Sequence, residues 1–211
     1  MRCALKINTD SVSKQLYDML REEILSRRLE PGAKIATKDI AEANHVSIMP
    51  VRDALLQLAS DGLVQNRERV GFFVRRFTTK EIQEIVEVRS MFELYCLRSH
   101  MENRDVSLWQ RIKERLAVAQ TIQELDQVDH ELHRSIVYMS GNQTLIGEYN
   151  RLYTLFSLGM SSGETSPYDL ARAEHGEIID AILSNDTVEA CAKLEHHLRR
   201  ACAEIVGLYR N

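Results

Sequence analysis

One stretch of the sequence, residues 37–77, limits the possible fold more than any other, because it combines two short helical patterns with a hairpin pattern. Thr37 can cap the first helix and Ser47 the second, with only a tight turn between them. Pro50 lies in the first turn of the second helix, where its missing N–H leaves no hydrogen bond unmade. Residues 63–77 have apolar ends around a polar centre that contains glycine, which predicts a β-hairpin. The stretch is therefore predicted to be a helix-turn-helix with a wing.

Helices are predicted on both sides of this stretch. An apolar face with helical spacing predicts one helix over residues 11–28. From Thr78 onward, helical spacing predicts about six more helices, and capping residues mark several of their starts. These starts are at Thr78, Thr121, Asn142, Ser166 and Asp186. The predicted fold class is mainly α, with an N-terminal winged helix-turn-helix domain in residues 1–77 and an all-α helical bundle of about six helices in residues 78–211.

The composition fits a globular protein that buries a core, since 44% of the 211 residues are hydrophobic and 27% are charged. No apolar run is long enough to span a membrane, and the first residues lack the apolar core of a secretory signal. We therefore expect a cytoplasmic protein with no membrane partner. The four cysteines lie far apart without paired spacing, which predicts reduced, mostly buried thiols.

Charge is distributed unevenly along the chain. Residues 1–77 contain 13 Lys and Arg against 10 Asp and Glu, whereas residues 78–211 contain 14 against 21. A mildly basic first part and an acidic second part are expected if only the first part meets a polyanion such as DNA. A difference of this size is also common between two domains that never meet nucleic acid.

The helix that begins near Ser47 is the predicted recognition helix, because the first turn of such a helix enters the major groove of DNA. Arg52 is its main candidate for a base or phosphate contact. The alternative for Arg52 is an ion pair with a neighbour or a solvated charge. Lys38 at the start of the preceding helix, and Arg67 and Arg69 in the hairpin, favour the DNA contact. The expected partner is a double-stranded DNA operator.

Several motifs in this first part resemble those of the GntR family of bacterial transcription regulators. They are PGAKI, the PVRDAL that follows the VS pair, and GFFV in the hairpin. The resemblance covers about residues 11–76, and it implies that DNA is contacted by Lys38, Ser47, Arg52 and Arg69, with Gly71 at the wing. The family often has Arg where this chain has Ile48. The loss of that polar contact bears on which DNA sequence is read, but not on the mode of binding.

Polar residues in the second part are spaced as metal ligands would be. Asp129 and His133 stand four residues apart, so a helix places them on one face. His175 and His197 lie at about equal distances from the turn between the last two predicted helices, so an antiparallel helix pair would put them level. Three imidazoles and a carboxylate suit a divalent metal ion such as Zn²⁺, Ni²⁺ or Mn²⁺. His196 remains a second candidate, and a hydrogen-bonded network without a metal is the alternative.

The second part also resembles the FCD effector domain of FadR-type GntR regulators. The shared motifs are DHELHRSI with SGN, EHGEIIDAI and HHLRRA, and they cover about residues 80–208. The resemblance implies that a metal ion is held by Asp129, His133, His175 and His197. Arg89 lies on the otherwise apolar stripe of the first bundle helix. It either pairs with Glu93, four residues further on, or binds the carboxylate of an effector, as the resemblance implies.

Together these patterns predict a ligand-responsive transcription regulator and not an enzyme. The family resemblance implies a repressor, and activation stays open as the alternative. A homodimer on a palindromic operator is expected, because two half-sites supply phosphate contacts that one modestly basic domain lacks. A small carboxylate effector is expected to bind at the metal ion and to Arg89. Two alternatives stay open: the metal itself is the signal, or the helical domain is a metalloenzyme with Glu174 as its general base.

Overall fold

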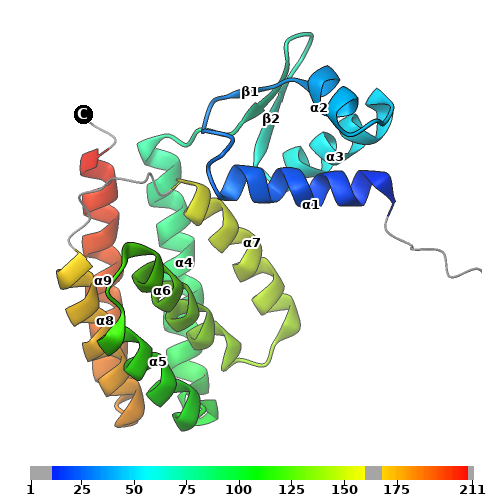
Figure 1. The fold of residues 1–211 in the computed structure, drawn as a ribbon. Helices are drawn as coiled ribbons and strands as arrows, with labels where there is room; N and C mark the ends of the chain where they lie inside the picture. The colour runs from blue at the N-terminus through cyan, green and yellow to red at the C-terminus, as the bar shows by residue number, and fades with distance from the viewer. Residues whose placement is uncertain (1–10, 160–167, 209–211) are drawn as a thin grey trace, which may run out of the picture. The chain divides into compact units, whose positions relative to one another are not determined.

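The computed structural model describes residues 11–159 and 168–208. Its internal contacts divide the chain into two compact units, one ending at Arg76 and the other beginning at Phe77. The sequence predicted a boundary after residue 77. Helices dominate the described residues, and a small sheet lies in the first unit only (Figure 1). The predicted class, a winged helix-turn-helix followed by a helical bundle, is confirmed.

The described part of the first unit contains three helices and a three-stranded sheet (Figure 1). The helices are α1 (Val12–Leu25), α2 (Thr37–Ala43) and α3 (Ile48–Ser60). The strands are β1 (Lys34–Ile35), β2 (Val64–Arg67) and β3 (Gly71–Val74). They are antiparallel in the order β1-β3-β2, with Lys34 opposite Phe73 and Val64 opposite Val74. Strands β2 and β3 are the predicted hairpin.

Apolar faces of α1 and α3 form the core of this unit. Leu16, Leu20 and Ile24 recur at helical spacing along α1, and all three are buried. The α3 residues Val51 and Leu55 are buried as well, and α1 and α3 pack together. Helix α3 also packs against α2 and β2, while Ile48, Met49 and Arg52 near its start stay exposed.

Three local features differ from the prediction. Ala36, and not Thr37, occupies the cap position of α2, and Thr37 is the first helical residue. Ser47 does occupy the cap position of α3, but its hydroxyl makes no capping hydrogen bond within the described residues. Strand β1 was not predicted, because two residues are too few to display the alternation by which a strand is recognised.

The described part of the second unit contains six α-helices and one short 3-10 turn (Figure 1). The helices are α4 (Thr79–His100), α5 (Val106–Val118), α6 (Ile122–Tyr138), α7 (Gln143–Gly159), α8 (Tyr168–Leu183) and α9 (Thr187–Leu208). The 3-10 turn η1 (Met101–Asn103) follows α4 directly. The number of helices agrees with the prediction.

Most of the predicted helix starts are correct, because each rests on a hydrogen bond inside one turn. Thr78 forms a capping box with Glu81, and Thr121 forms another with Glu124. The side chain of Asn142 accepts hydrogen bonds from two backbone N–H groups at the start of α7. Asp186 caps α9 through the N–H of Glu189. The start predicted at Ser166 lies outside the described residues.

The bundle is arranged around α4, which packs against α9, α7 and α6, while α8 packs against α9 and α5 (Figure 1). Trp109, Leu132 and Ile178 are among the fully buried apolar side chains. Six charged or ionisable side chains are buried in the same interior: Arg89, Glu93, His133, Glu174, His175 and His197. Buried groups of this kind need partners, and they mark where a site lies.

Two further expectations concern thiols and membranes. Within the described residues, Cys96 and Cys191 are free and buried, and Cys202 is free and half-buried. Cys3 lies outside the described residues. None of the helices in the described part of the chain is both long and apolar enough to cross a bilayer.

Candidate functional site

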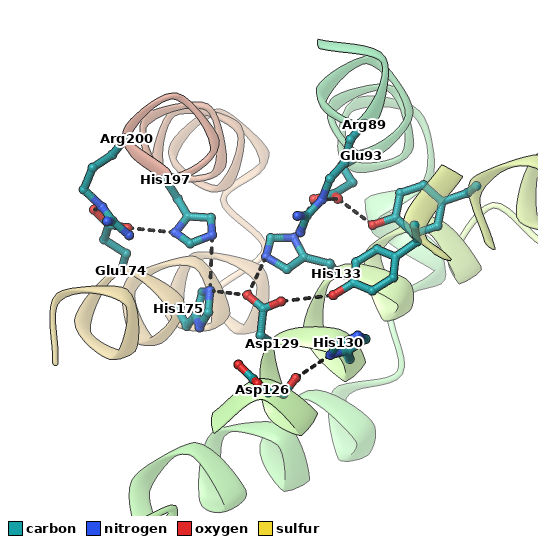
Figure 2. Close-up of polar contacts among 12 residues, drawn as sticks. Arg89, Glu93, Asp126, Asp129, His130, His133, Glu174, His175, His197 and Arg200 are labelled. Atoms are coloured by element: carbon teal, nitrogen blue, oxygen red, sulfur yellow. Dashed lines mark hydrogen bonds and ion pairs between the residues drawn. The ribbon is translucent and has the colours of Figure 1, made fainter. Parts of the chain in front are cut away.

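The four residues predicted as metal ligands come together inside the second unit (Figure 2). Asp129 and His133 lie on α6, His175 on α8 and His197 on α9. One ligand atom from each side chain lies within 4.8 Å of the other three. Oδ1 of Asp129 is 3.2 Å from Nε2 of His175 and 3.4 Å from Nε2 of His133. The Nε2 atoms of His175 and His197 are 3.2 Å apart.

Helix geometry explains this convergence. Asp129 and His133 are one turn apart on α6, so both face the bundle interior. A short turn joins α8 to α9, and the two helices pack side by side as a helical hairpin (Figure 1). His175 and His197 are therefore level with each other, as their distances from the turn predicted. The ligand atoms come from three helices, so the cluster exists only when the bundle is assembled.

A second set of carboxylates orients the histidine rings. Nδ1 of His133 lies 2.6 Å from a carboxylate oxygen of Glu93, and Nδ1 of His197 lies 2.7 Å from one of Glu174. In the neutral ring, a carboxylate beside Nδ1 accepts the proton of that nitrogen, which leaves Nε2 with a lone pair directed at the cluster. The hydroxyl of Tyr153 donates to Oδ2 of Asp129 at 3.1 Å, so Oδ1 is the oxygen that faces the histidines.

Each of these outer carboxylates is in turn held by an arginine. Nε of Arg89 donates to Glu93 at 2.7 Å, and Nε of Arg200 donates to Glu174 at 2.6 Å (Figure 2). Tyr149 also donates to Glu93, at 2.6 Å. The cluster is thus flanked by two Arg–Glu–His chains, one ending at His133 and the other at His197. Such chains fix ring orientation before any ligand arrives.

Electrostatics favours the metal-binding forms of Asp129 and His197. Burial raises the pKa of Glu93, but His133 and Arg89 outweigh this and lower it to about 2. Burial also raises the pKa of Asp129, yet His133 and His175 hold it well below its usual range. Burial, together with the neighbouring histidines, lowers the pKa of His197 well below its usual value. A charged carboxylate and a neutral imidazole are the forms that bind metal ions. Burial and Arg89 lower the pKa of His133, but Glu93 and Asp129 outweigh them and raise it above its usual value, so a metal ion at Nε2 must displace a proton there.

The residues of the cluster fit a divalent metal ion. Nε2 of His133 is buried, and its contact with Oδ1 of Asp129 at 3.4 Å does not have hydrogen-bond geometry, so within the described residues this nitrogen has no well-formed hydrogen bond. An unpartnered buried nitrogen is costly in a site made only of protein, and a cation removes that cost. Three imidazoles and one carboxylate, with further carboxylates behind two of the rings, are the donor set expected for Zn²⁺ or a similar ion.

Arg89 forms the predicted ion pair with Glu93, and one of its nitrogens remains unused. Nη2 is buried without a hydrogen-bond partner in the described part of the chain. Its guanidinium carbon lies 4.4 Å from the ring centre of Phe156 and 5.2 Å from that of Tyr153. Burial lowers the pKa of Arg89, but the negative charges around it, first of all Glu93, outweigh burial and hold the pKa well above its usual value. The side chain is a fixed cation with a spare donor.

Other candidates lie outside the cluster. The sequence left a choice between His196 and His197. The side chain of His196 is 72% exposed whereas that of His197 is buried, so burial favours His197. His130 contacts the backbone carbonyl of Asp126 and the hydroxyl of Ser157. Glu174, the predicted general base of the enzyme alternative, is held by His197 and Arg200.

Several residues of the site were not predicted as parts of it. Glu93 was considered only as the ion-pair partner of Arg89, and Tyr153 and Arg200 were not considered. A signal did exist for Glu93, since it is a charged residue on the apolar stripe of α4. Arg200 lies on α9 and its partner Glu174 lies on α8, so no local sequence pattern connects the two.

The residues predicted to contact DNA lie on the surface of the first unit. Lys38, Ser47, Arg52 and Arg69 are all exposed. Within the described residues, no ion pair is formed by Arg52, so the alternative of a local salt bridge is not realised. Gly71 begins β3 with a φ of 121°, a conformation that favours glycine at this point of the hairpin. Arg69 precedes it with a φ of 60°.

A winged helix joined to a helical domain with a buried histidine and aspartate cluster defines a class: two-domain, DNA-binding transcription regulators. Residues 12–74 match the model of the bacterial regulatory proteins of the GntR family, and residues 84–200 match that of the FCD domain. The chain therefore belongs to the GntR family and carries an FCD domain. It is a transcription regulator rather than an enzyme, as predicted.

Known relatives are similar over most of the chain. A probable D-xylose utilization operon transcriptional repressor of Paenarthrobacter nicotinovorans is 30% identical over 201 residues, which are 92% of this chain and 88% of the relative. A GntR transcriptional regulator from Rhodococcus sp. RHA1 has the same fold, with a TM-score of 0.82 at 22% identity over 93% of this chain and 98% of that one. The Zn²⁺-bound FCD domain of TM0439 is 28% identical, with a TM-score of 0.57, over 64% of this chain and 99% of that domain.

Proposed function

We propose that this GntR regulator is a repressor that binds operator DNA as a homodimer and is controlled by a small carboxylate at a metal-containing FCD domain. The observation that carries the proposal is the convergence of Asp129, His133, His175 and His197 beside Nη2 of Arg89, which has no hydrogen-bond partner in the described part of the chain. The zinc found in the FCD domain of TM0439, a protein 28% identical to this chain over the shared region, supports the same assignment. The repressor name of the D-xylose operon relative supports the direction of control.

In this proposal the metal ion is held by Asp129 and by Nε2 of the three histidines. A divalent ion bound there supplies a positive charge that attracts carboxylate oxygens. Arg89 binds the same effector carboxylate through Nη2, which the ion pair with Glu93 leaves available. Phe156 and Tyr153 flank the guanidinium of Arg89 and keep it in place, so this group is already oriented when the effector enters.

The DNA-binding step uses the exposed face of the first unit. The first turn of α3, with Ser47 and Arg52, enters the major groove, while Lys38 and the hairpin around Arg69 contact the phosphate backbone. Gly71 lets the hairpin turn there. The first unit holds only a small excess of positive charge, so one copy neutralises few phosphates. Two copies on a palindromic operator double these contacts.

The surface that fits a second copy lies along α4, beside α9. Met91, Leu94 and Tyr95 form an apolar strip there, and Met91 and Tyr95 are 67% and 52% exposed. Glu87 and Arg98 stand at opposite ends of this strip. If two α4 helices cross antiparallel at the middle of the strip, Glu87 of each copy faces Arg98 of the other, and Met91 faces Leu94. The strip is thus complementary to itself, as a two-fold interface requires.

Control follows from linkage between the two ligands. A carboxylate releases DNA only if it binds better to the dimer arrangement that fits the operator poorly. The buried Arg–Glu–His chains join α4, α6, α8 and α9, so an effector bound at their centre acts on the helix that carries the proposed dimer strip.

The test is an operator-binding assay on the full chain with its metal content controlled. A duplex selected by the wild-type protein from a random pool is titrated after chelation and after reloading with Zn²⁺, Ni²⁺ or Mn²⁺, each with and without a panel of small mono- and dicarboxylates. We expect at least one carboxylate to weaken operator binding about 5-fold or more, and only in the metal-loaded protein. Arg89→Lys should lose the response, whereas Arg111→Lys, at an exposed position on α5, should keep it.

Other outcomes separate the alternatives. Metal addition that switches operator affinity without any carboxylate would establish the metal-responsive regulator instead. A metal-loaded protein that responds to no carboxylate and to no metal would refute the proposed control. For the dimer strip, sedimentation of Arg98→Glu and Glu87→Arg should show monomers, and the double swap should restore the dimer. A single variant that stays dimeric would rule this strip out.

A further inference from the structure

The first turn of the recognition helix α3 exposes apolar side chains. Ile48 is 45% exposed and Met49 is 66% exposed, although Val51 in the same turn is completely buried. Burying an apolar side chain of this size is favourable by roughly 1.5–3 kcal/mol relative to leaving it in water. Single exposed apolar residues are common on protein surfaces. Two consecutive ones at the tip of the helix that meets DNA are a more specific observation.

Ile48 and Met49 lie at the end of α3 that is proposed to contact DNA. Ile48 is four residues before Arg52, so the two lie on the same face of the helix, and Arg52 is exposed there as well. Among residues 47–52, only Ser47 and Arg52 have side chains that can form hydrogen bonds. The tip of the recognition helix therefore offers two polar and two large apolar side chains to base edges.

Only one of the four DNA bases presents an apolar group in the major groove, and that group is the C5 methyl of thymine. Purines and cytosine show hydrogen-bond donors and acceptors at the corresponding edges. Ile48 and Met49 carry no donor, so against a polar base edge they could not replace the hydrogen bonds to water that the edge loses on contact. We infer that Ile48 and Met49 read thymine methyl groups, so that each operator half-site contains thymine under the first turn of α3. This inference rests on the proposed entry of α3 into the major groove.

The matching experiment removes the methyl group from the DNA and the apolar side chains from the protein. The full-length wild-type chain selects its operator from a random duplex pool. Each thymine of that operator is then replaced in turn by deoxyuridine, which lacks only the C5 methyl and keeps the same hydrogen-bond edges. Affinities are measured by fluorescence anisotropy at one fixed salt concentration, because DNA affinity depends strongly on salt.

We expect at least one thymine in each half-site whose replacement weakens binding about fourfold, the equivalent of one buried methyl group. Replacement in both half-sites should weaken binding about fifteenfold, since the two contacts are far apart and add. The double variant Ile48→Ala, Met49→Ala should bind the unmodified operator more weakly and should no longer distinguish thymine from deoxyuridine. Loss of the discrimination together with the side chains is what assigns the contact to these residues.

Leu56 provides the matched control. It is an exposed apolar residue of the same helix, 45% exposed like Ile48, but it lies two turns further from the tip. Leu56→Ala should keep the full discrimination. Equal discrimination in the wild type and in the double variant would overturn the inference, and so would a wild type insensitive to every deoxyuridine replacement while Arg52→Ala still weakens binding. If Arg52→Ala leaves operator affinity unchanged, α3 does not enter the groove, and the proposed DNA-binding mode fails together with the inference.

Discussion

The two units hold their proposed functional residues in opposite ways. On the first unit, Ser47 and Arg52 are exposed, and within the described residues neither has a side-chain partner of its own. In the second unit, His133 and His197 are buried, and each is bonded to a carboxylate that is bonded to an arginine. The first arrangement is completed only by an external partner. The second is organised in advance, so changes there should affect ligand binding through neighbours as well as directly.

The largest expected effect is the loss of a residue from the buried cluster. His197→Ala should lower zinc affinity by about 100-fold or more, because it removes one of four donors and leaves Glu174 without its histidine partner. His196→Ala is the matched control, since the neighbouring side chain is 72% exposed, and it should leave zinc affinity within a few-fold of the wild type. Competition of the purified chain with a chromophoric zinc chelator measures both. Equal losses in the two variants would contradict the buried site.

A smaller effect is expected one contact further out. Glu174→Gln should weaken metal binding by about 10-fold and up to 100-fold, because the neutral amide no longer strengthens His197 as a donor. Glu177→Gln lies on the same helix, where Glu177 pairs with Lys193 at the surface, and it should change metal affinity little. Thermal unfolding of both variants without metal checks that the bundle is intact. If Glu174→Gln binds zinc as tightly as the wild type, the outer carboxylates do not organise the cluster.

The smallest effect compares two helix starts, one in each unit. Asn142→Ala should destabilise the protein by about 1 kcal/mol, because the Asn142 side chain accepts two backbone hydrogen bonds at the start of α7. Ser47→Ala should change stability by less than about 0.5 kcal/mol, since the Ser47 hydroxyl makes no capping hydrogen bond within the described residues. Urea unfolding measures both changes. Operator affinity should reverse the order, with Ser47→Ala weakening DNA binding and Asn142→Ala leaving it unchanged.

Local patterns in the sequence predicted much of the fold, and the exceptions have local causes too. The capping boxes at Thr78 and Thr121 are correct, because a capping box is a contact between residues three apart. Thr37 was wrongly taken as a cap, since a single Thr before a helical pattern does not distinguish the cap from the first helical position. The hairpin was recognised from its polar centre, whereas the two-residue strand β1 carries no such pattern.

In the candidate site, too, contacts within one helix could be predicted from the sequence, whereas contacts between helices could not. Asp129 and His133 could be paired from the sequence, because one helical turn brings residues four apart together. His175 and His197 could be paired only by assuming a helical hairpin. The contacts that distinguish His197 from its neighbour, to Glu174 and to His175, depend on packing between helices. Spacing from the turn and the family resemblance both pointed to His197, but spacing alone left its neighbour His196 as a second candidate.

By itself, the sequence determined the helices, most of their starts and the residue types available on each helix face, because these depend on interactions within a few residues. It determined the family for a related reason, since the motifs are short and contiguous. Only the tertiary structure decided which polar residues are buried, which carboxylate lies behind each histidine, and that Nη2 of Arg89 stays unpaired among the described residues. Glu93 and His133 are 40 residues apart in the chain, and Glu174 and His197 are 23 apart. Contacts over such separations exist only after helices pack, because packing removes water and brings buried charges close enough to need one another.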